Sequence, residues 1–319
     1  MLVTGGSGFI GSHVVDRLRA HGHEPRNLDL QRSPYDRDLD TVVGDLLDAE
    51  TVRRALEGCD AVIHLAAVAD VNDVAADSAR AETVNTHGTA VLVDVARQAG
   101  APRVLFGSTV WVYGDAIARK TLAEDAPLPP PKHLYTATKR AGELLCAASG
   151  VEHTILRFGI PYGPRARATT VVAAFVARAR AGSPLMLAGD GTQSRRFVYV
   201  EDLAEGVVAA LAPVAANRVY NLVGDESVTV RTIADTVREL VADVPVVRVE
   251  SRAGDLHGAA ISGERAAREL GWRPQTGFRA GVARYVDWVT AQHPIPRAAT
   301  ASTIDGRAAA VLRQLPGEL

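Results

Sequence analysis

Cysteines and long apolar runs are scarce in this sequence. Cys59 and Cys146 are its only cysteines, and they form neither a CxxC pair nor a disulfide framework. We therefore expect a protein of a reducing compartment, the cytoplasm, that needs no disulfide and no metal. No apolar run approaches the ~18 residues that span a bilayer, so we expect no membrane partner. The first residues, MLVTGGSGFIGSHVV, lack the basic flank and unbroken apolar core of a signal peptide.

An excess of charge of either sign is also absent. The 35 lysines and arginines against 37 aspartates and glutamates give a net charge of -2, which leaves no basic surplus for binding nucleic acid. Lysine itself is rare, because only Lys120, Lys132 and Lys139 occur. The 319 residues, 47% hydrophobic and 23% charged, indicate a globular chain of one large domain or two smaller ones.

Short apolar runs alternate with amphipathic helical patterns along the first half of the chain. This alternation, with right-handed crossovers, predicts an α/β fold, namely a Rossmann-type doubly wound parallel sheet. The predicted strands lie at 2–4, 27–30, 61–67, 104–108 and 153–158, and the predicted helices at about 12–20, 49–57, 79–99 and 135–149.

The regular alternation changes beyond Gly163. We predict a Rossmann domain over 1–163 plus about 197–225, and a smaller, interleaved α/β lobe that binds substrate over about 164–196 plus 226–293. The tail, 294–319, receives no function. The later elements expected are a strand and helix over 197–211, strands at 220–223 and 246–250, and helices near 169–181, 230–241, 263–270 and 278–291.

A glycine-rich segment follows the first predicted strand and opens a helix. Residues 6–11, GSGFIG, match the G-x-G-x-x-G pattern in the context that the motif requires. Such glycines let backbone amides approach a pyrophosphate at a helix N-terminus, although they also simply relieve crowding at a tight turn. The dinucleotide contacts expected from this loop are at Gly5, Gly8, Phe9, Ile10 and Gly11.

Two acidic residues follow later strands. Asp29 lies close to the ~20-residue spacing at which a carboxylate binds the adenosine ribose. It would repel a 2′-phosphate, which favours NAD over NADP, while the nearby Arg32 leaves the choice open. Asp45 and its neighbour Leu46 are expected to approach the adenine. The alternative for Asp45 is a helix N-cap.

Tyr135 and Lys139 stand four residues apart on a predicted helix, so both side chains project from one face. A free tyrosine has a pKa near 10, too high for a base at neutral pH. A neighbouring ammonium favours the phenolate, so we expect Lys139 to lower the pKa of Tyr135 and make it a general acid/base.

Taken in order, several motifs resemble the extended short-chain dehydrogenase/reductase family, and more narrowly its NAD-dependent nucleotide-sugar epimerase/dehydratase branch. The resemblance runs from residue 1 to about residue 290. Its motifs here are TGGSGFIG, HLAA, the pair Tyr135 and Lys139, LRFGIPYGPR, RRFVYVEDLAEGV and RAGDLHGAAISGERAARELGWRP.

The resemblance implies site residues. The catalytic trio would be Thr109, Tyr135 and Lys139, with Ser108 as the fallback for the hydroxyl residue. Thr109 would bind the reacting sugar hydroxyl, Tyr135 would take its proton, and Lys139 would hold the nicotinamide ribose, so Tyr135 and Lys139 would also bind the cofactor. His64 is interpreted as a core histidine. Leu65, Ala66, Ala67 and Asn85 would bind the cofactor, and Arg195, Arg252 and Asp255 would bind the nucleotide part of the substrate. Ile160 replaces an asparagine that the family usually places at the diphosphate. The resemblance also implies a homodimer through helices at about 79–99 and 135–149.

Two positions bear on the reaction. Relatives that eliminate water carry Asp-Glu directly after the catalytic threonine, and decarboxylating relatives keep the glutamate. Here Val110 and Trp111 stand instead. The resemblance therefore implies epimerisation of a nucleotide sugar, chiefly at C4, through a transient 4-keto intermediate with bound NAD recycled. The alternatives are an NAD(P)H-dependent nucleotide-sugar reductase or dehydrogenase and a non-catalytic NAD-sensing protein.

Overall fold

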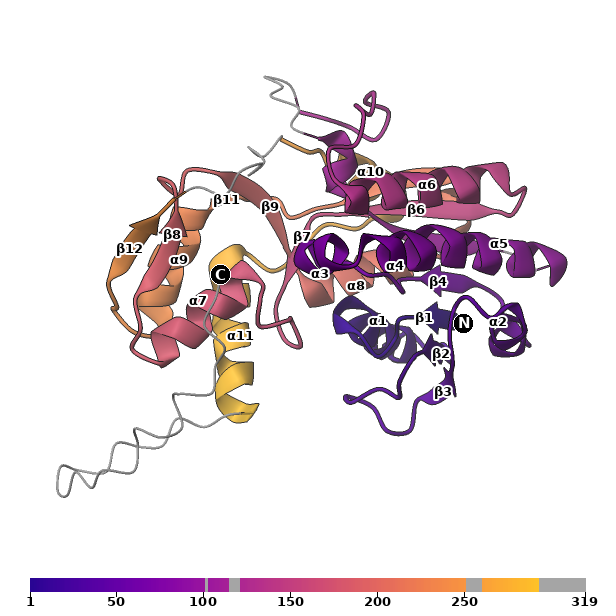
Figure 1. The fold of residues 1–319 in the computed structure, drawn as a ribbon, viewed down its shortest axis with the longest axis horizontal. Coiled ribbons are helices and arrows are strands. Elements are labelled where there is room, and N and C mark those ends of the chain that lie inside the picture. The colour runs from indigo at the N-terminus through magenta and orange to yellow at the C-terminus, as the bar shows by residue number, and fades with distance from the viewer. Residues whose placement is uncertain (101–102, 115–120, 251–259, 293–319) are drawn as a thin grey trace.

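The computed structural model describes residues 1–100, 103–114, 121–250 and 260–292. Within these ranges a large parallel sheet with helices on both faces adjoins a smaller lobe, which lies on the left in Figure 1. None of the helices in the described ranges is both long and apolar enough to cross a membrane. The predicted tail, 294–319, lies outside them.

The large sheet has seven strands in the order β10-β6-β5-β4-β1-β2-β3, and every neighbouring pair is parallel. The chain order reverses between β1 and β4, which is where a doubly wound sheet leaves a crevice at its carboxyl edge. The predicted Rossmann-type sheet is confirmed. Its strands are β1 (Leu2–Thr4), β2 (Arg26–Asp29), β3 (Asp40–Val43), β4 (Val62–His64), β5 (Val104–Thr109), β6 (His153–Phe158) and β10 (Arg218–Leu222).

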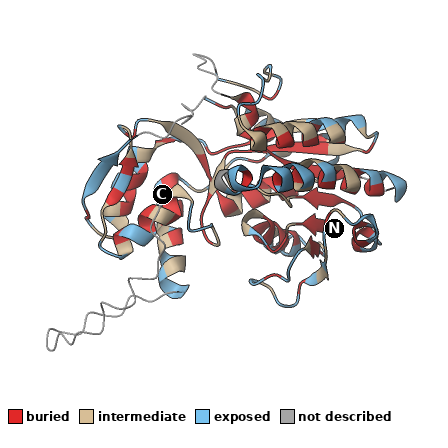
Figure 2. Cartoon of the chain, in the orientation of Figure 1, coloured by how far each residue is buried: buried red, intermediate tan, exposed pale blue. Residues whose placement is uncertain are grey.

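Helices cover both faces of this sheet, and each face has its own apolar core, drawn red in Figure 2. One core joins the sheet to α1 (Phe9–Ala20), α8 (Val200–Ala209) and α10 (Glu264–Leu270). The other joins it to α2 (Ala49–Leu56), α5 (Gly88–Gln98) and α6 (Leu134–Ala148). Short 3-10 turns lie at η2 (Val110–Tyr113) and η3 (Pro213–Ala215).

The single helix expected at 79–99 is interrupted. The structure has α3 (Val71–Ala76), α4 (Ser78–Glu82), a π turn η1 (Thr83–His87) and then α5. A π turn inserts one residue per turn and occurs often beside functional sites. This turn carries Asn85, whose side chain points to the loop after β4.

In the part of the chain that the structure describes, the smaller lobe has two short sheets and three helices. Its strands are β11 (Ser227–Thr229), β9 (Ser194–Tyr199) and β7 (Ile160–Tyr162) in one sheet, and β12 (Val246–Val249) and β8 (Leu185–Ala188) in the other. Its helices are α7 (Val171–Arg180), α9 (Val230–Leu240) and α11 (Phe278–Gln292).

Three elements depart from the predicted domain boundaries. β7 falls within 1–163 and β9 crosses the predicted boundary between 196 and 197, yet both pair in the lobe sheet, because Tyr162, Phe197 and Phe278 pack their rings together in the lobe core. α10 falls within the predicted lobe but packs on β10 of the large sheet. The lobe and the sheet are thus more interleaved than expected.

Candidate active site

A cavity of about 580 Å³ opens at the carboxyl edge of the large sheet and extends to the lobe. This volume lies in the range of ligand pockets, about 300–1,000 Å³. Most of the predicted cofactor residues line it, namely Gly5, Gly8, Phe9, Ile10, Gly11, Asp29, Asp45, Leu46, Leu65, Ala66, Ala67 and Tyr135. The far wall is formed by Ile160, Pro161, Arg167 and Thr170.

The glycine loop leaves no room for side chains. Gly5 has φ of +76°, and a Cβ there would lie 2.8 Å from the amide nitrogen of Ala66. A Cβ on Gly11 would lie 2.1 Å from the carbonyl oxygen of Gly5. Gly8 precedes α1 as its N-cap, so the first amides of the helix point toward the cavity with the positive end of the helix dipole. This cradle suits a pyrophosphate.

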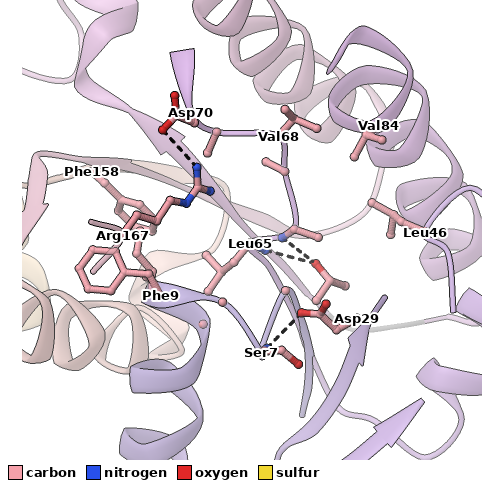
Figure 3. Close-up of a pocket in the computed structure, with 18 of the residues that line it drawn as sticks. Ser7, Phe9, Asp29, Leu46, Leu65, Val68, Asp70, Val84, Phe158 and Arg167 are labelled. Atoms are coloured by element: carbon pink, nitrogen blue, oxygen red, sulfur yellow. Dashed lines mark hydrogen bonds and ion pairs between the residues drawn. The ribbon is translucent and has the colours of Figure 1, made fainter. Parts of the chain in front are cut away.

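Asp29 ends β2 directly beside this loop, as Figure 3 shows. Its Oδ2 accepts a hydrogen bond from the amide of Ser7 at 3.1 Å, and its carboxylate lies on the cavity wall. Arg32 is exposed and does not line the cavity. A carboxylate held at this place suits the ribose hydroxyls of NAD.

The helix-cap alternative for Asp45 is wrong. The N-cap of α2 is Asp48, whose side chain accepts from the amide of Glu50. Asp45 instead accepts from the amide of Leu47 at 3.0 Å and lines the cavity. Sequence could not separate the two aspartates because both precede the same helix by a few residues.

His64 is a satisfied core histidine, as interpreted from the sequence. Its Nδ1 lies 2.7 Å from Thr4 Oγ1 and its Nε2 lies 3.0 Å from Thr89 Oγ1. Burial lowers the pKa of His64 to about 3, so the ring is neutral. Thr4 Oγ1 also accepts from the amides of Leu65 and Ala66 at 3.2 Å each. Thr4, which sequence reasoning missed, thus orients the backbone that lines the cavity.

Asn85 lies behind the cavity wall. Its amide accepts from the Val68 amide at 2.8 Å and donates to the Val68 carbonyl at 3.0 Å. A second donor bond reaches Thr138 Oγ1 on α6 at 3.2 Å. The residue is buried and is not among those lining the cavity, so it holds the lining residue Val68 rather than facing the cleft.

Thr109 ends β5 and, like Tyr135, lines the cavity. Its Oγ1 accepts from the amide of Trp111 at 3.2 Å, which leaves the hydroxyl hydrogen available for a ligand. The fallback residue, Ser108, donates its hydroxyl to the buried carboxylate of Glu143 at 2.6 Å. This bond occupies the only hydroxyl donor of Ser108, so the geometry favours Thr109.

The expected effect of Lys139 on Tyr135 is corrected by the structure. Burial raises the pKa of Tyr135 to about 12, and the charge of Arg167 counteracts this rise only in part. The Lys139 ammonium donates to the Gly107 carbonyl at 2.9 Å and lies 5.9 Å from the centroid of the Tyr135 ring. Burial lowers the pKa of Lys139 itself to about 8. Desolvation, which sequence spacing does not reveal, therefore dominates both groups.

Two further residues line the reaction end of the cavity. The Trp111 ring meets Tyr135 edge-on, with centroids 6.1 Å apart, and its Nε1 is buried without a hydrogen-bond partner in the described parts of the chain. Arg167 reaches across the mouth to Asp70, with Nη1 and Oδ2 3.6 Å apart (Figure 3). Sequence reasoning missed Arg167, because nothing local distinguishes it from the other arginines around it.

The predicted substrate residues are less well placed. Arg195 lies on β9 and donates to the Ser194 carbonyl at 2.9 Å, and it is not among the residues lining the cavity. Arg252 and Asp255 lie outside the described residues. Over the ranges that the structure describes, no group of three or more histidine, cysteine, aspartate or glutamate side chains could hold a metal ion.

Comparison with known proteins agrees with this geometry. Residues 1–223 match the model of the NAD dependent epimerase/dehydratase family. The chain is 32% identical to the dTDP-glucose 4,6-dehydratase of Streptomyces griseus, over 90% of this chain and 93% of that protein. It is also 32% identical to the UDP-glucose 4-epimerase of Mycolicibacterium smegmatis, over 90% and 97%.

A solved structure shares the fold. The Thermus thermophilus UDP-glucose 4-epimerase in complex with NAD superposes with a TM-score of 0.83 at 33% identity, covering 92% of this chain and 99% of that one. The glycine cradle, the placed carboxylate of Asp29 and the cavity volume fit such a dinucleotide. The predicted cofactor and the resemblance are confirmed, and the chain belongs to the NAD-dependent epimerase/dehydratase family.

Proposed function

We propose that this protein is a nucleotide-sugar epimerase, acting chiefly at C4 through a transient 4-keto intermediate. One observation supports this choice over elimination. The two residues after Thr109 are Val110, which is buried in an apolar cluster, and Trp111, which lines the cavity, and neither has an acidic or basic side chain. Removing water or carbon dioxide needs an extra proton-transfer group there. The two curated relatives, a dehydratase and an epimerase, are equally similar to this chain, so overall identity does not decide between them.

The hydroxyls of Thr109 and Tyr135 bind and deprotonate the reacting hydroxyl of the sugar. Thr109, with its lone pair engaged by the Trp111 amide, donates its hydrogen to the sugar oxygen. Tyr135 removes the proton of that oxygen and later returns it. Lys139, fixed on the Gly107 carbonyl, supports the strand end that carries Thr109.

The high pKa of Tyr135 must be overcome for it to act as a base. NAD, held by the glycine loop and Asp29, would supply the hydride acceptor and donor. The charge of Arg167 favours the phenolate of Tyr135. The protonated tyrosine is in turn well suited to return the proton when the ketone is reduced.

We propose that the substrate lies toward the lobe side of the cavity, near Ile160, Pro161, Arg167 and Thr170. Arg195, Arg252 and Asp255 remain candidates for its nucleotide part. Guanidinium groups suit phosphate geometry, and Ile160 offers no amide to the diphosphate. Arg167 therefore joins the candidates for that contact.

The proposal is tested by incubating the purified protein with UDP-, GDP- and dTDP-sugars without added cofactor and following the anomeric protons by NMR. A new diastereomer, formed without consumption of NADH, is the expected result. A 4-keto-6-deoxy product would indicate a dehydratase instead, and stoichiometric NADH consumption a reductase. No turnover of any sugar by protein that binds NAD would favour a sensing role.

We also propose a cytoplasmic homodimer. Helices α4, α5 and α6 pack side by side on one face of the sheet, and Leu144 on α6 is 67% exposed. Both cysteines are free, which fits a reducing compartment. Light scattering of wild type and Leu144→Arg tests the dimer: the wild type should have twice the monomer mass and the variant should dissociate.

A further inference from the structure

Asn27 is a fully enclosed polar residue beneath the glycine loop. It lies in β2, and its exposure is 0%. Burying an amide side chain without hydrogen-bond partners would cost stability, and both the oxygen and the nitrogen of the Asn27 side chain have a partner. Its Oδ1 accepts from the amide of Gly6 at 2.8 Å, and its Nδ2 donates to Ser7 Oγ at 2.9 Å. Both partners belong to the loop that faces the dinucleotide cleft.

Ser7 extends this network to the end of β2. Its Oγ, which accepts from Asn27, donates to the Gln31 carbonyl at 2.7 Å. Its amide donates to Asp29 Oδ2 at 3.1 Å. Asn27 and Asp29 are two residues apart on one strand, so their side chains share a face of the sheet. That face of β2 therefore binds two consecutive loop amides, those of Gly6 and Ser7.

This arrangement determines which amides remain for a phosphate. Gly6 and Ser7 donate to side chains, and the Gly8 amide donates to the Gly5 carbonyl at 3.0 Å. The amides of Phe9 and Ile10, in the first turn of α1, have no acceptor within the helix. The direction of these two amides depends on the loop that Asn27 holds. The same network fixes the Asp29 carboxylate through Ser7.

The Asn27 side chain packs directly against the backbone of Gly6. A Cβ on Gly6 would lie 2.5 Å from Asn27 Oδ1, so only glycine leaves room for this contact. An apolar side chain in place of Asn27 would leave the Gly6 amide without its acceptor and Ser7 Oγ without its donor. The loop would then no longer be tied to the strand.

We propose that Asn27 is a positioning residue for NAD, which aligns the first turn of α1 and the Asp29 carboxylate with the pyrophosphate and the ribose. Asn27 does not itself line the cavity, so it acts through the loop. This inference rests on the proposed function only in requiring that NAD occupies the cleft. It does not depend on which reaction follows.

The test compares Asn27→Leu with Asn221→Leu by titration calorimetry with NAD and with UDP. Asn221 is a matched control, because it is also 0% exposed and its side-chain amide also has two hydrogen-bond partners. Its Oδ1 accepts from Tyr113 Oη at 2.8 Å, and its Nδ2 donates to the Ser262 carbonyl at 3.0 Å. It does not line the cavity. Thermal unfolding of both variants reports the loss of stability that each causes.

We expect Asn27→Leu to raise the NAD dissociation constant about tenfold or more, the effect of leaving a buried donor unpaired. Its UDP dissociation constant, and both constants of Asn221→Leu, should stay within about twofold of wild type. An Asn27→Leu protein that binds NAD as wild type does, or an Asn221→Leu protein equally weakened, overturns the inference.

Ser7→Ala supplies a second variant should Asn27→Leu fail to fold. It removes one atom and keeps the bond between Asn27 and Gly6, so we expect a rise of about threefold in the NAD dissociation constant. An unchanged constant in Ser7→Ala would then overturn the inference. A wild-type protein that binds no NAD would contradict the proposed function itself, which is a separate outcome.

Discussion

The two walls of the cavity are built on different principles. The cofactor wall presents backbone amides and small residues from the loops that follow β1, β2, β3 and β4, and side chains such as Thr4 and Asn27 hold that backbone in place. The reaction wall presents side chains, Thr109, Tyr135 and Arg167, that come from separate elements. A backbone cradle can serve one ligand through many changes of sequence. Side chains from separate elements can be exchanged singly, so the substrate and the reaction can change while NAD binding persists.

The largest expected effect is confined to the reaction wall. Tyr135→Phe removes only the phenolic oxygen and should lower turnover by at least about 100-fold, the usual scale of general acid/base assistance. NAD affinity should not change, since the cradle is intact. Tyr220→Phe is the control. Tyr220 lies in β10 and does not line the cavity, and its hydroxyl donates to the Glu269 carboxylate at 2.9 Å. Steady-state kinetics and NAD titration measure both, and undiminished turnover would remove Tyr135 from the mechanism.

The next effect lies behind the reaction wall and concerns pH. The pKa of Lys139 is lowered by burial from 10.5 to about 8, so its charged form destabilises the fold by about 3 kcal/mol at pH 7. Between pH 8 and 10.5 the unfolded chain keeps this proton and the folded protein loses it, so stability rises with pH across that window. Lys139→Met should therefore be the more stable protein at pH 7.

Urea unfolding of wild type and Lys139→Met at pH 7 and at pH 10.5 measures this difference. At pH 7 the free energy of unfolding of Lys139→Met should exceed that of wild type, and we expect this excess to be about 3 kcal/mol smaller at pH 10.5. A constant advantage would mean that Lys139 keeps its ordinary pKa in the folded protein.

A smaller effect should be confined to the cofactor wall. Asp29→Ala removes the carboxylate that the Ser7 amide orients, and should weaken NAD about tenfold, the scale of a hydrogen bond to a charged group. Turnover at saturating NAD should be affected little. Asp29→Asn is the matched control, since it keeps an acceptor for Ser7. Fluorescence titration with NADH measures both variants, and equal binding by Asp29→Ala and wild type would refute the ribose assignment.

The smallest effect tests where the reaction wall ends. The Arg167 side chain is 49% exposed, so Arg167→Ala should raise the KM for the nucleotide sugar only about threefold and leave NAD affinity unchanged. Arg97→Ala is the control, because it removes an exposed arginine paired with Asp94 on α5, away from the cavity. A weaker affinity for NAD in Arg167→Ala would assign this residue to the cofactor wall instead.

The difference between the cofactor wall and the reaction wall also explains which features could be predicted from the sequence. The glycine loop and Asp29 form a local motif, so their place followed from spacing alone. The π turn, Thr83–His87, contains neither glycine nor proline, so nothing in the sequence marks a break in the predicted helix. The strands β7, β8 and β11 have three or four residues, too few for a period-2 pattern.

The pKa values of the reaction pair could not be predicted from residue spacing. Tyr135 and Lys139 do stand on one helix as expected, but the extent of burial, which determines both shifts, depends on elements far away in the chain. Asn27 did leave a signal that was overlooked. It is a polar residue in a strand whose neighbour Leu28 is apolar and buried, next to a loop of glycines.

The order of the strands has a consequence for how the protein is made. β6 pairs with β5 on one side and with β10 on the other, and between β6 and β10 the chain forms four elements of the lobe, β7, α7, β8 and β9, followed by α8. At a ribosomal rate of about 5–20 residues per second, those roughly 60 residues take about 3–12 seconds to emerge. Throughout that interval the nascent sheet has an open apolar edge. Chaperones that shield strand edges should therefore matter most while this one gap is being synthesised.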